Sequence, residues 1–309
     1  MSSGLRFDGK VVIITGAGNG LGRSYALDIA RRGGQVVVND LGGSTDGKGS
    51  SDAAAARVVE EIRAAGGTAV PSFDSVATPE GGQAITDAAL KAFGRVDAVI
   101  ANAGILRDRS FAKLSPEELD AILAVHLRGT FFTVQPAFRW MKDNGGGNIV
   151  TTTSASGLYG NFGQSNYAAA KMGIAGMTRV VALEGAKFNV KANCLGPTAS
   201  TRLTQGAGMA AASEDPDADP MAPARVAALA VALAHSSCPA NGEIFNAAGG
   251  WYSRAVIAYT GGWLAGRGEY TADAVAAHWA QIRDTADLSV PFDAMAFGAD
   301  IGKKTGLPG

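Results

Sequence analysis

The chain has 309 residues, 47% of them hydrophobic, and a formal net charge of −1 at pH 7, so it can bury a substantial core. No basic excess indicates a nucleic-acid partner, and the longest apolar run, VAALAVALA, is too short to span a bilayer. The N-terminal stretch lacks the apolar segment of a signal peptide, and Cys194 and Cys238 form neither a disulfide framework nor a metal pattern. We therefore expect a cytoplasmic protein that binds a small molecule, without a metal or a membrane span.

Short β-branched runs alternate with longer helical patterns along the first 250 residues. Runs that are apolar almost throughout and separated by helices are typical of a parallel sheet covered on both faces. Seven runs predict strands: KVVIIT from Lys10, QVVVND from Gln35, TAVPSFD from Thr68, VDAVIANAG from Val96, GNIVTTTS from Gly147, VKANCLG from Val190 and EIFNAAGG from Glu243. We therefore expect an α/β fold, a single doubly wound Rossmann domain with a seven-stranded parallel sheet over residues 1–250.

The first strand runs directly into a glycine-rich turn, TGAGNGLG, which opens a helix at Leu21. Gly16, Gly20 and Gly22 have no side chains, so backbone amides and the helix N-terminus can approach a pyrophosphate closely. A glycine pattern alone is weak evidence, but a strand before it and a helix after it are the context that a dinucleotide site requires. We predict cofactor binding at these three glycines and at Leu21.

Asp40 ends the second strand, eighteen residues beyond Gly22. A carboxylate at this place accepts hydrogen bonds from the adenosine ribose hydroxyls and repels a 2′-phosphate. Asn19 and Leu41 occupy flanking positions where an arginine would favour that phosphate, and neither is charged. The sequence therefore predicts NAD rather than NADP.

Further strand ends fit the same cleft. Asp74 follows the third strand, where it could meet the adenine. Asn102, Ala103 and Gly104 follow the fourth, where small residues let the backbone approach the cofactor. Each is also an ordinary turn signal when taken alone. Because the carboxyl ends of parallel strands meet at one edge of the sheet, we place these residues in the cofactor site, together with Pro197 at the end of the sixth strand.

The helix that follows the fourth strand has a defined start. Ser115 supplies a cap, Pro116 a first-turn proline and Glu118 a capping-box acid. His126 lies further along this helix, and taken alone it fits a satisfied core histidine better than a functional one.

One tyrosine has a lysine in helical register. Tyr167 and Lys171 are four residues apart, so on a helix both side chains lie on one face and can reach one site. Tyr159 has no such partner, because Gly160 and Gly163 separate it from the helix. Tyr167 is therefore the candidate for chemistry.

Ser154 ends the fifth strand, thirteen residues before Tyr167, and the returning loop can bring it to Tyr167 and Lys171 beside the cofactor. A free tyrosine has a pKa near 10 and needs help to ionise at pH 7. The lysine ammonium and the positive nicotinamide ring favour the phenolate, and a depression of about three units corresponds to roughly 4 kcal/mol. We predict that Tyr167 takes the proton of a substrate alcohol while the alcohol carbon gives hydride to NAD⁺, and that Ser154 holds the same oxygen.

Two further segments stand apart from the alternation. Residues from about 198 to 223 form a long stretch at the carboxyl end of the sixth strand, so we predict a lid there, with a plain surface loop as the alternative. After Gly250 the sequence is rich in aromatic residues and holds Trp251, Trp263 and Trp279, three of the four tryptophans. We expect residues 251–309 to bury them against the core domain or a partner subunit.

Together these residues resemble the short-chain dehydrogenase/reductase superfamily over roughly Phe7 to Gly250: T-G-x3-G-x-G, Asn-Ala-Gly, a serine and Tyr-x3-Lys. Longer blocks, among them LRFDGKVV, NAGILRDRSF and SASGLYGNFGQSNYAAAKMG, look like the (3R)-hydroxyacyl-CoA dehydrogenase units of peroxisomal multifunctional β-oxidation enzymes, also called type-four 17β-hydroxysteroid dehydrogenases. The resemblance implies a Rossmann fold, NAD, a Ser/Tyr/Lys catalytic set and a homodimer whose long helices pack together.

The sequence departs from the family pattern at several places, and these departures leave the substrate and the cellular location open. The superfamily generally has asparagine at the position of His126, where it helps a water relay protons to the lysine, although the more similar family shares the histidine. The acidic SEDPDADP insertion does not match the family pattern, and the terminal LPG is not a peroxisomal address.

The leading hypothesis is an NAD-dependent (3R)-3-hydroxyacyl-CoA dehydrogenase, whose acyl group could be as bulky as a steroid side chain. Arg107 and Arg109 are candidate contacts for the CoA part, or ordinary surface charges. The second hypothesis is a dehydrogenase of a free hydroxysteroid or another secondary alcohol. The third is a dinucleotide-binding protein without turnover, which the presence of Ser154, Tyr167 and Lys171 argues against. We expect a homodimer or homotetramer.

Overall fold

The computed structural model describes residues 4–201 and 218–306. The chain forms two compact units, Met1–Arg254 and Ala255–Gly309. The predicted lid, residues 198 to 223, falls largely outside the described residues.

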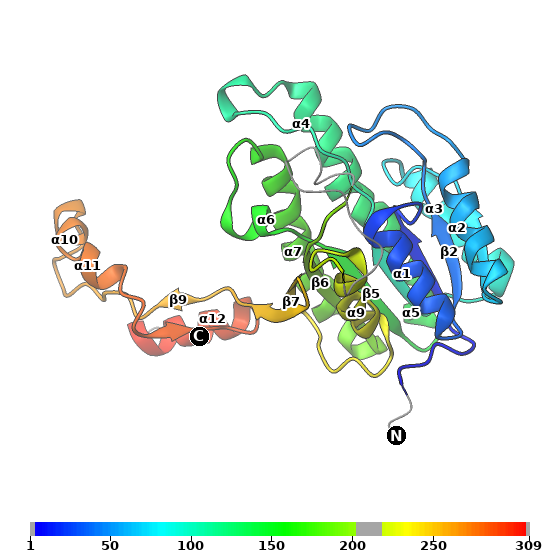
Figure 1. Ribbon diagram of the computed structural model, residues 1–309. Coiled ribbons are helices and arrows are strands. Elements are labelled where there is room, and N and C mark those ends of the chain that lie inside the picture. The colour runs from blue at the N-terminus through cyan, green and yellow to red at the C-terminus, as the bar shows by residue number, and fades with distance from the viewer. Residues whose placement is uncertain (1–3, 202–217, 307–309) are drawn as a thin grey trace. The chain divides into compact units, whose positions relative to one another are not determined.

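The larger unit is built on an eight-stranded sheet in the order β3-β2-β1-β4-β5-β6-β7-β8 (Figure 1). Its strands are β1 Val11–Thr15, β2 Gln35–Asn39, β3 Thr68–Ser72, β4 Ala98–Ala101, β5 Gly147–Thr152, β6 Val190–Thr198, β7 Ile244–Ala248 and β8 Trp251–Ala255. The first seven are the predicted strands, and they pair in parallel. The sheet has one more strand than the seven predicted. This strand, β8, follows β7 across Gly249 and Gly250, whose φ angles of 58° and 87° permit a two-residue turn.

The composition of each strand matches its place in the sheet. All five residues of β1 are buried, as expected for a central strand with helices on both faces. β3 lies at the edge of the sheet and tolerates Pro71, since an edge strand does not need every backbone N–H for pairing.

Helices cover both faces of this sheet, which confirms the doubly wound α/β fold (Figure 1). One face packs against α1 Gly20–Arg31, α2 Ala53–Ala64 and α9 Pro223–Ala234, and the other against α3 Pro79–Phe93, α5 Gly129–Asp143 and α7 Ser165–Gly185. Tyr25 and Ile62 are fully buried on the first face, and Ile85 and Met141 on the second. Each such side chain contributes about 1.5–3 kcal/mol of hydrophobic stabilisation.

The predicted long helix after β4 is divided into three parts. α4, Pro116–Ile122, starts with the expected capping box, in which Ser115 Oγ accepts from Glu118 N at 3.2 Å and Glu118 Oε2 accepts from Ser115 N at 3.1 Å. The chain then widens into a π-helical turn, η2 Leu123–Arg128, before α5 begins. Such turns are frequent at functional sites, and this one carries His126. The remaining short elements are η1 Phe111–Lys113, α6 Ala155–Tyr159 and η3 Ala186–Phe188.

The smaller unit has little buried apolar surface of its own. β9 Tyr259–Thr260 pairs antiparallel with β10 Leu288–Ser289, and its helices are α10 Ala272–Ala277, α11 Trp279–Ile282 and α12 Ala294–Thr305. Among its described residues only Gly302 is buried, whereas Trp279, Phe292 and Met295 are exposed. In the part of the chain that the structure describes, we find no helix with the length and apolar character needed to cross a membrane.

Candidate active site

The strand order reverses between β1 and β4, and open α/β sheets bind ligands at the carboxyl ends of the strands at such a switch point. A cleft of about 460 Å³ lies there, a size typical of small-molecule sites. All but one of the predicted site residues line it: Gly16, Gly20, Leu21, Asp40, Asp74, Asn102, Ala103, Gly104, Ser154, Tyr167, Lys171 and Pro197. Gly22 does not line the cleft.

The turn after β1 requires glycine at two positions, where a side chain would not fit. Gly16 has a φ of 66°, and a Cβ atom there would lie 2.8 Å from Ala103 Cα. A Cβ atom at Gly22 would collide with the Gly16 carbonyl oxygen, so Gly22 acts by letting α1 pack directly against the turn. The first N–H groups of a helix have no partner inside the helix. The N-terminus of α1 therefore opens toward the cleft as a cradle that fits a dinucleotide pyrophosphate.

Asp40 is held in the cleft by two backbone amides. Its Oδ2 accepts from Gly18 N at 2.8 Å, and its Oδ1 accepts from Gly42 N at 2.7 Å. These contacts fix a negative charge beside the glycine turn, at the place where the adenosine ribose lies in such folds.

Arg57 is a residue of this region that the sequence analysis missed. From α2, its Nη2 donates to Gly18 O at 3.0 Å and to Asn19 Oδ1 at 2.9 Å. Its Nε lies 3.7 Å from Glu61 Oε1, so the positive charge has a partner. An uncharged Asn19 was one reason to predict NAD, and a guanidinium beside it removes that reason. The cofactor prediction therefore depends on Asp40.

The small residues after β4 are tied to the end of β1. Thr15 Oγ1 accepts from Asn102 N and from Ala103 N, both at 3.1 Å, and Asn102 Nδ2 donates to Thr15 O at 3.1 Å. A Cβ atom at Gly104 would collide with the His126 ring. Glycine is therefore needed at this position by close packing.

Tyr167 and Lys171 point from one face of α7 toward the end of β5, as predicted. Lys171 Nζ donates to Thr152 O at 2.8 Å and lies 5.4 Å from the centroid of the Tyr167 ring. Lys171 is 3% exposed, and burial lowers its pKa to about 8. Ser154 lies two residues beyond Thr152, at the N-terminus of α6. The structure thus brings the three predicted catalytic side chains into one cleft.

The protein's own groups raise the Tyr167 pKa on balance. Burial raises this pKa, the Ser154 hydroxyl lowers it, and the negative charge of Asp108 raises it. The ammonium of Lys171 is directed at a carbonyl oxygen rather than at the phenol oxygen, which explains why it gives no comparable depression. Positive charge brought beside the phenol oxygen would act against this rise and favour the phenolate.

His126 is only partly a satisfied core histidine. Its Nε2 lies 2.7 Å from Ile105 O, while its Nδ1 is buried without a hydrogen-bond partner among the residues that the structure describes. Its ring meets the Tyr167 ring edge-on, with centroids 5.1 Å apart. Burial, and secondarily the charge of Lys171, lowers the His126 pKa to about 3. The imidazole is therefore neutral at neutral pH.

A polar network that the sequence analysis missed joins the segment after β4 to the loop around α6. Asp108 Oδ2 accepts from Gln164 Nε2 at 2.7 Å, and Gln164 Oε1 accepts from Ser156 Oγ at 2.7 Å. Ser156 N in turn donates to Ser154 Oγ at 3.2 Å. No spacing in the sequence links these residues, because they come from separate loops that meet only in the fold.

The fold, the switch-point cleft and this set of side chains define a short-chain dehydrogenase. The family model described as short chain dehydrogenase matches residues 10–211, and the chain belongs to that family. It is an oxidoreductase that acts on a CH–OH group.

The chain is also similar to particular proteins of known name, in sequence and in structure. The chain is 46% identical to the peroxisomal multifunctional enzyme type 2 of Mus musculus over 293 residues, which cover 94% of this chain but 39% of that protein. It is 40% identical to the hydroxyacyl-CoA dehydrogenase ChsB1 of Mycobacterium tuberculosis over 250 residues, 77% of this chain and 76% of that protein. A 7α-hydroxysteroid dehydrogenase solved with NADH and 7-oxo glycochenodeoxycholic acid superposes with a TM-score of 0.69 and 26% identity, covering 79% of this chain and 95% of that one. The resemblance to the multifunctional enzymes is therefore confirmed, and the chain spans about two fifths of the length of the mouse enzyme.

Proposed function

We propose that this protein oxidises a (3R)-3-hydroxyacyl-CoA to the 3-ketoacyl-CoA with NAD⁺, in a β-oxidation-type pathway. The observation that carries the proposal is the convergence of Ser154, Tyr167 and Lys171 on one cleft with the glycine turn and Asp40. The similarity to ChsB1, which is named as a hydroxyacyl-CoA dehydrogenase, supports a hydroxyacyl-CoA substrate. The similarity to the peroxisomal multifunctional enzymes supports the β-oxidation-type pathway. Acyl groups as bulky as a steroid side chain are included in the proposal.

In the proposed mechanism Tyr167 is the general base for the substrate 3-hydroxyl. Ser154 donates a hydrogen bond to the same oxygen and so holds it beside the Tyr167 hydroxyl. Lys171 is anchored at the Thr152 carbonyl, 5.4 Å from the Tyr167 ring centroid, and is mostly protonated at pH 7 with a pKa of about 8. Its charge would add to that of the bound nicotinamide in favouring the phenolate. A nicotinamide held by the glycine turn and Asp40 would supply the acceptor for the hydride that leaves the substrate carbon.

The choice of NAD over NADP is part of the proposal. The carboxylate of Asp40, fixed by two amides, supports it, because a negative charge there opposes a 2′-phosphate. NADH in the superposed 7α-hydroxysteroid dehydrogenase supports a nicotinamide cofactor in the same fold. Gly16, Gly20 and Leu21 would hold the pyrophosphate, with Gly22 as the packing position behind them. The remaining lining residues, Asp74, Asn102, Ala103, Gly104 and Pro197, would hold the rest of the dinucleotide.

A dehydrogenase of a free hydroxysteroid or another secondary alcohol is the second candidate. The superposition on a 7α-hydroxysteroid dehydrogenase favours it, and the same three side chains would perform the same chemistry. The two candidates differ only in whether the substrate carries CoA.

The experiment that separates them is NADH formation from NAD⁺ with a panel of 3-hydroxyacyl-CoA enantiomers and matched free alcohols, short-chain and steroid-bearing. The main proposal predicts turnover of the 3R thioesters, with the free alcohols at least tenfold lower in kcat/KM. Turnover confined to free alcohols would replace it with the second candidate.

We further propose a homodimer or homotetramer, in which the part of the predicted extension 251–309 that follows β8 covers the core domain or a partner subunit. Exposed apolar side chains on the long helices, Phe131 on α5 and Leu183 on α7, support association of subunits. The exposed aromatic side chains of the extension support its burial against further surface. Light scattering at several protein concentrations, with the full chain and with a chain ending at Arg254, tests both points.

We propose the cytoplasm as the site of action. Cys194 and Cys238 are both free and buried, which suits a reducing compartment. Fractionation of cells that produce the protein tests this location, and recovery of the protein in a membrane-bounded compartment would overturn it.

A further inference from the structure

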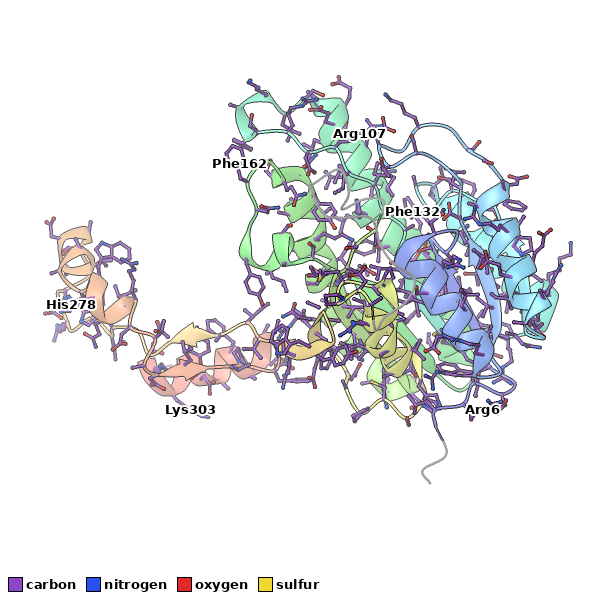
Figure 2. All side chains as sticks on the ribbon, viewed as in Figure 1. Arg6, Arg107, Phe132, Phe162, His278 and Lys303 are labelled. Atoms are coloured by element: carbon purple, nitrogen blue, oxygen red, sulfur yellow. The ribbon has the colours of Figure 1, made fainter. Side chains whose placement is uncertain are left out.

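The loop of residues 41–51 and the segment after β4 form one wall at the rim of the cleft. Leu106 N donates to Thr45 O at 3.0 Å, and both of these residues line the cleft. Arg107 follows directly, on the segment that leads from β4 toward α4 (Figure 2). Its carbonyl oxygen accepts from Nδ2 of Asn166 at 3.0 Å, and Asn166 is 1% exposed and precedes the predicted catalytic tyrosine in α7. The backbone of Arg107 is therefore held by a buried side chain beside the site.

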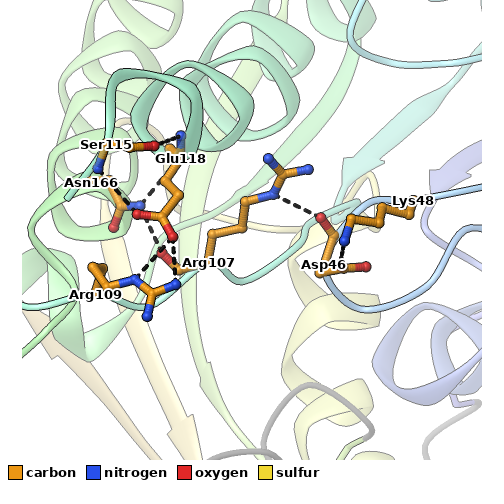
Figure 3. Close-up of polar contacts among 7 residues, drawn as sticks. All are labelled: Asp46, Lys48, Arg107, Arg109, Ser115, Glu118 and Asn166. Atoms are coloured by element: carbon orange, nitrogen blue, oxygen red, sulfur yellow. Dashed lines mark hydrogen bonds and ion pairs between the residues drawn. The ribbon is translucent and has the colours of Figure 1, made fainter. Parts of the chain in front are cut away.

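Two nearby cations, Arg109 and Lys48, already have carboxylate partners. Arg109 directs Nε and Nη2 at Oε1 of Glu118, at 3.0 and 2.8 Å (Figure 3). Lys48 Nζ lies 3.2 Å from Oδ2 of Asp46. Both pairs are charge-neutral and engaged at the protein surface.

Arg107 is bound differently. Among the described residues only its Nε has a hydrogen-bond partner, the carbonyl oxygen of Asp46 at 2.9 Å, while its charge also acts at longer range on Glu118, whose pKa it lowers. Figure 3 shows its two terminal nitrogens directed away from that contact. The side chain is half-buried, so the contact fixes its position while two parallel donors remain available. A planar pair of charged N–H donors is the arrangement that suits a phosphate group.

A CoA thioester carries phosphate groups that a free alcohol lacks, and these lie at the far end of the pantetheine arm from the reacting carbon. A cation for those phosphates must therefore stand at the rim of the cleft and not beside the catalytic side chains. We propose that Arg107 is a specificity-determining residue that binds a phosphate group of the CoA thioester through its two terminal nitrogens. This inference rests on the proposed function and deepens it, because it names the residue that makes the enzyme selective for the CoA thioester over the free alcohol.

The test compares three thioesters of one (3R)-3-hydroxyacyl group, on CoA, on 4′-phosphopantetheine and on pantetheine, in the wild type, Arg107→Gln and the control Arg109→Gln. Glutamine at 107 keeps an N–H donor for the Asp46 carbonyl but loses the charge. In the wild type we expect kcat/KM for CoA to exceed that for pantetheine at least tenfold, and to fall as salt is added. Arg107→Gln should reduce this ratio at least tenfold, about 1.4 kcal/mol, through KM and without slowing the pantetheine substrate. Arg109→Gln should keep the wild-type ratio.

The 4′-phosphopantetheine thioester shows which phosphate of CoA Arg107 binds. A loss for this substrate as large as that for CoA assigns Arg107 to the phosphate next to the pantetheine arm, whereas a loss confined to CoA assigns it to the phosphates of the nucleotide part. An unchanged ratio in Arg107→Gln, or equal losses for CoA and pantetheine, overturns the inference while the proposed function stands. Absence of wild-type turnover with all three thioesters overturns both.

Discussion

His126 carries a pH dependence of stability that follows from its burial. It is 2% exposed, and its pKa falls from an ordinary 6.5 to about 3, mainly because burial disfavours the charged ring. In the unfolded chain the same imidazole takes up a proton near its ordinary pKa. Between pH 6.5 and pH 3 the unfolded state therefore binds more protons than the folded state, and acid favours unfolding.

The size of the effect follows from the same linkage. At pH 5 the solution pH is about 1.5 units below the pKa of the imidazole in the unfolded chain, so that imidazole is protonated, whereas the folded one is still neutral. This residue alone then lowers the free energy of unfolding by about 2 kcal/mol relative to pH 7.5. Any folded pKa below about 4 gives nearly the same figure, because the buried ring is uncharged at pH 5 in each case.

The assay is urea unfolding of the wild type and of His126→Gln at pH 7.5 and pH 5, followed by circular dichroism at one protein concentration. Glutamine does not titrate, and its amide can still donate to the Ile105 carbonyl. We expect the variant to lose about 2 kcal/mol less than the wild type between the two pH values. Any general loss of stability in the variant cancels in this difference. Equal losses in both proteins would refute the reasoning.

Three other predictions follow from the site. Asp40→Ala should lower the preference for NAD⁺ over NADP⁺ in kcat/KM by roughly tenfold, since it removes the charge that opposes a 2′-phosphate; steady-state kinetics with both cofactors checks this, and an unchanged ratio contradicts it. Asp108→Asn should move the rise of kcat/KM for alcohol oxidation to lower pH, because the Asp108 charge raises the Tyr167 pKa; a pH profile with the wild-type midpoint would count against it. Gly104→Ala should lower the free energy of unfolding by about 1–3 kcal/mol in a urea titration, because the added methyl collides with the His126 ring, and a stability equal to the wild type would disprove the close packing.

The sequence predicted most of the sheet because the signals are local. Each of the seven parallel strands is a short apolar run between helical patterns, and the capping box at Ser115 fixed the start of α4. The eighth strand was missed because Trp251 and Tyr252 follow a Gly-Gly turn in a segment without the helical alternation. The π-helical turn around His126 was missed because its helical pattern resembles that of an ordinary α-helix, and the widening is visible only in the backbone hydrogen bonds.

The site could be predicted where chemistry depends on strand ends or on helical spacing. Asp40 follows β2, next to the switch-point strand β1, and Tyr167 and Lys171 are one helical turn apart, so topology alone brings them to one cleft. Arg57 could not be found this way, because it reaches the glycine turn only through the packing of α2. The burial that raises the Tyr167 pKa could not be predicted either, because burial is a property of the packed site and not of the residue spacing.

The account depends most on Tyr167 as the base of an NAD⁺-dependent oxidation. The direct measurement is single-turnover NADH formation from a (3R)-3-hydroxyacyl-CoA, with the enzyme in excess and NAD⁺ saturating, in the wild type and in Tyr167→Phe. Saturation removes any effect of the change on cofactor affinity, and circular dichroism confirms that the variant is folded. The account predicts a rate that is lower by about 10²–10⁴-fold in the variant. A folded variant that forms NADH at the wild-type rate would contradict it.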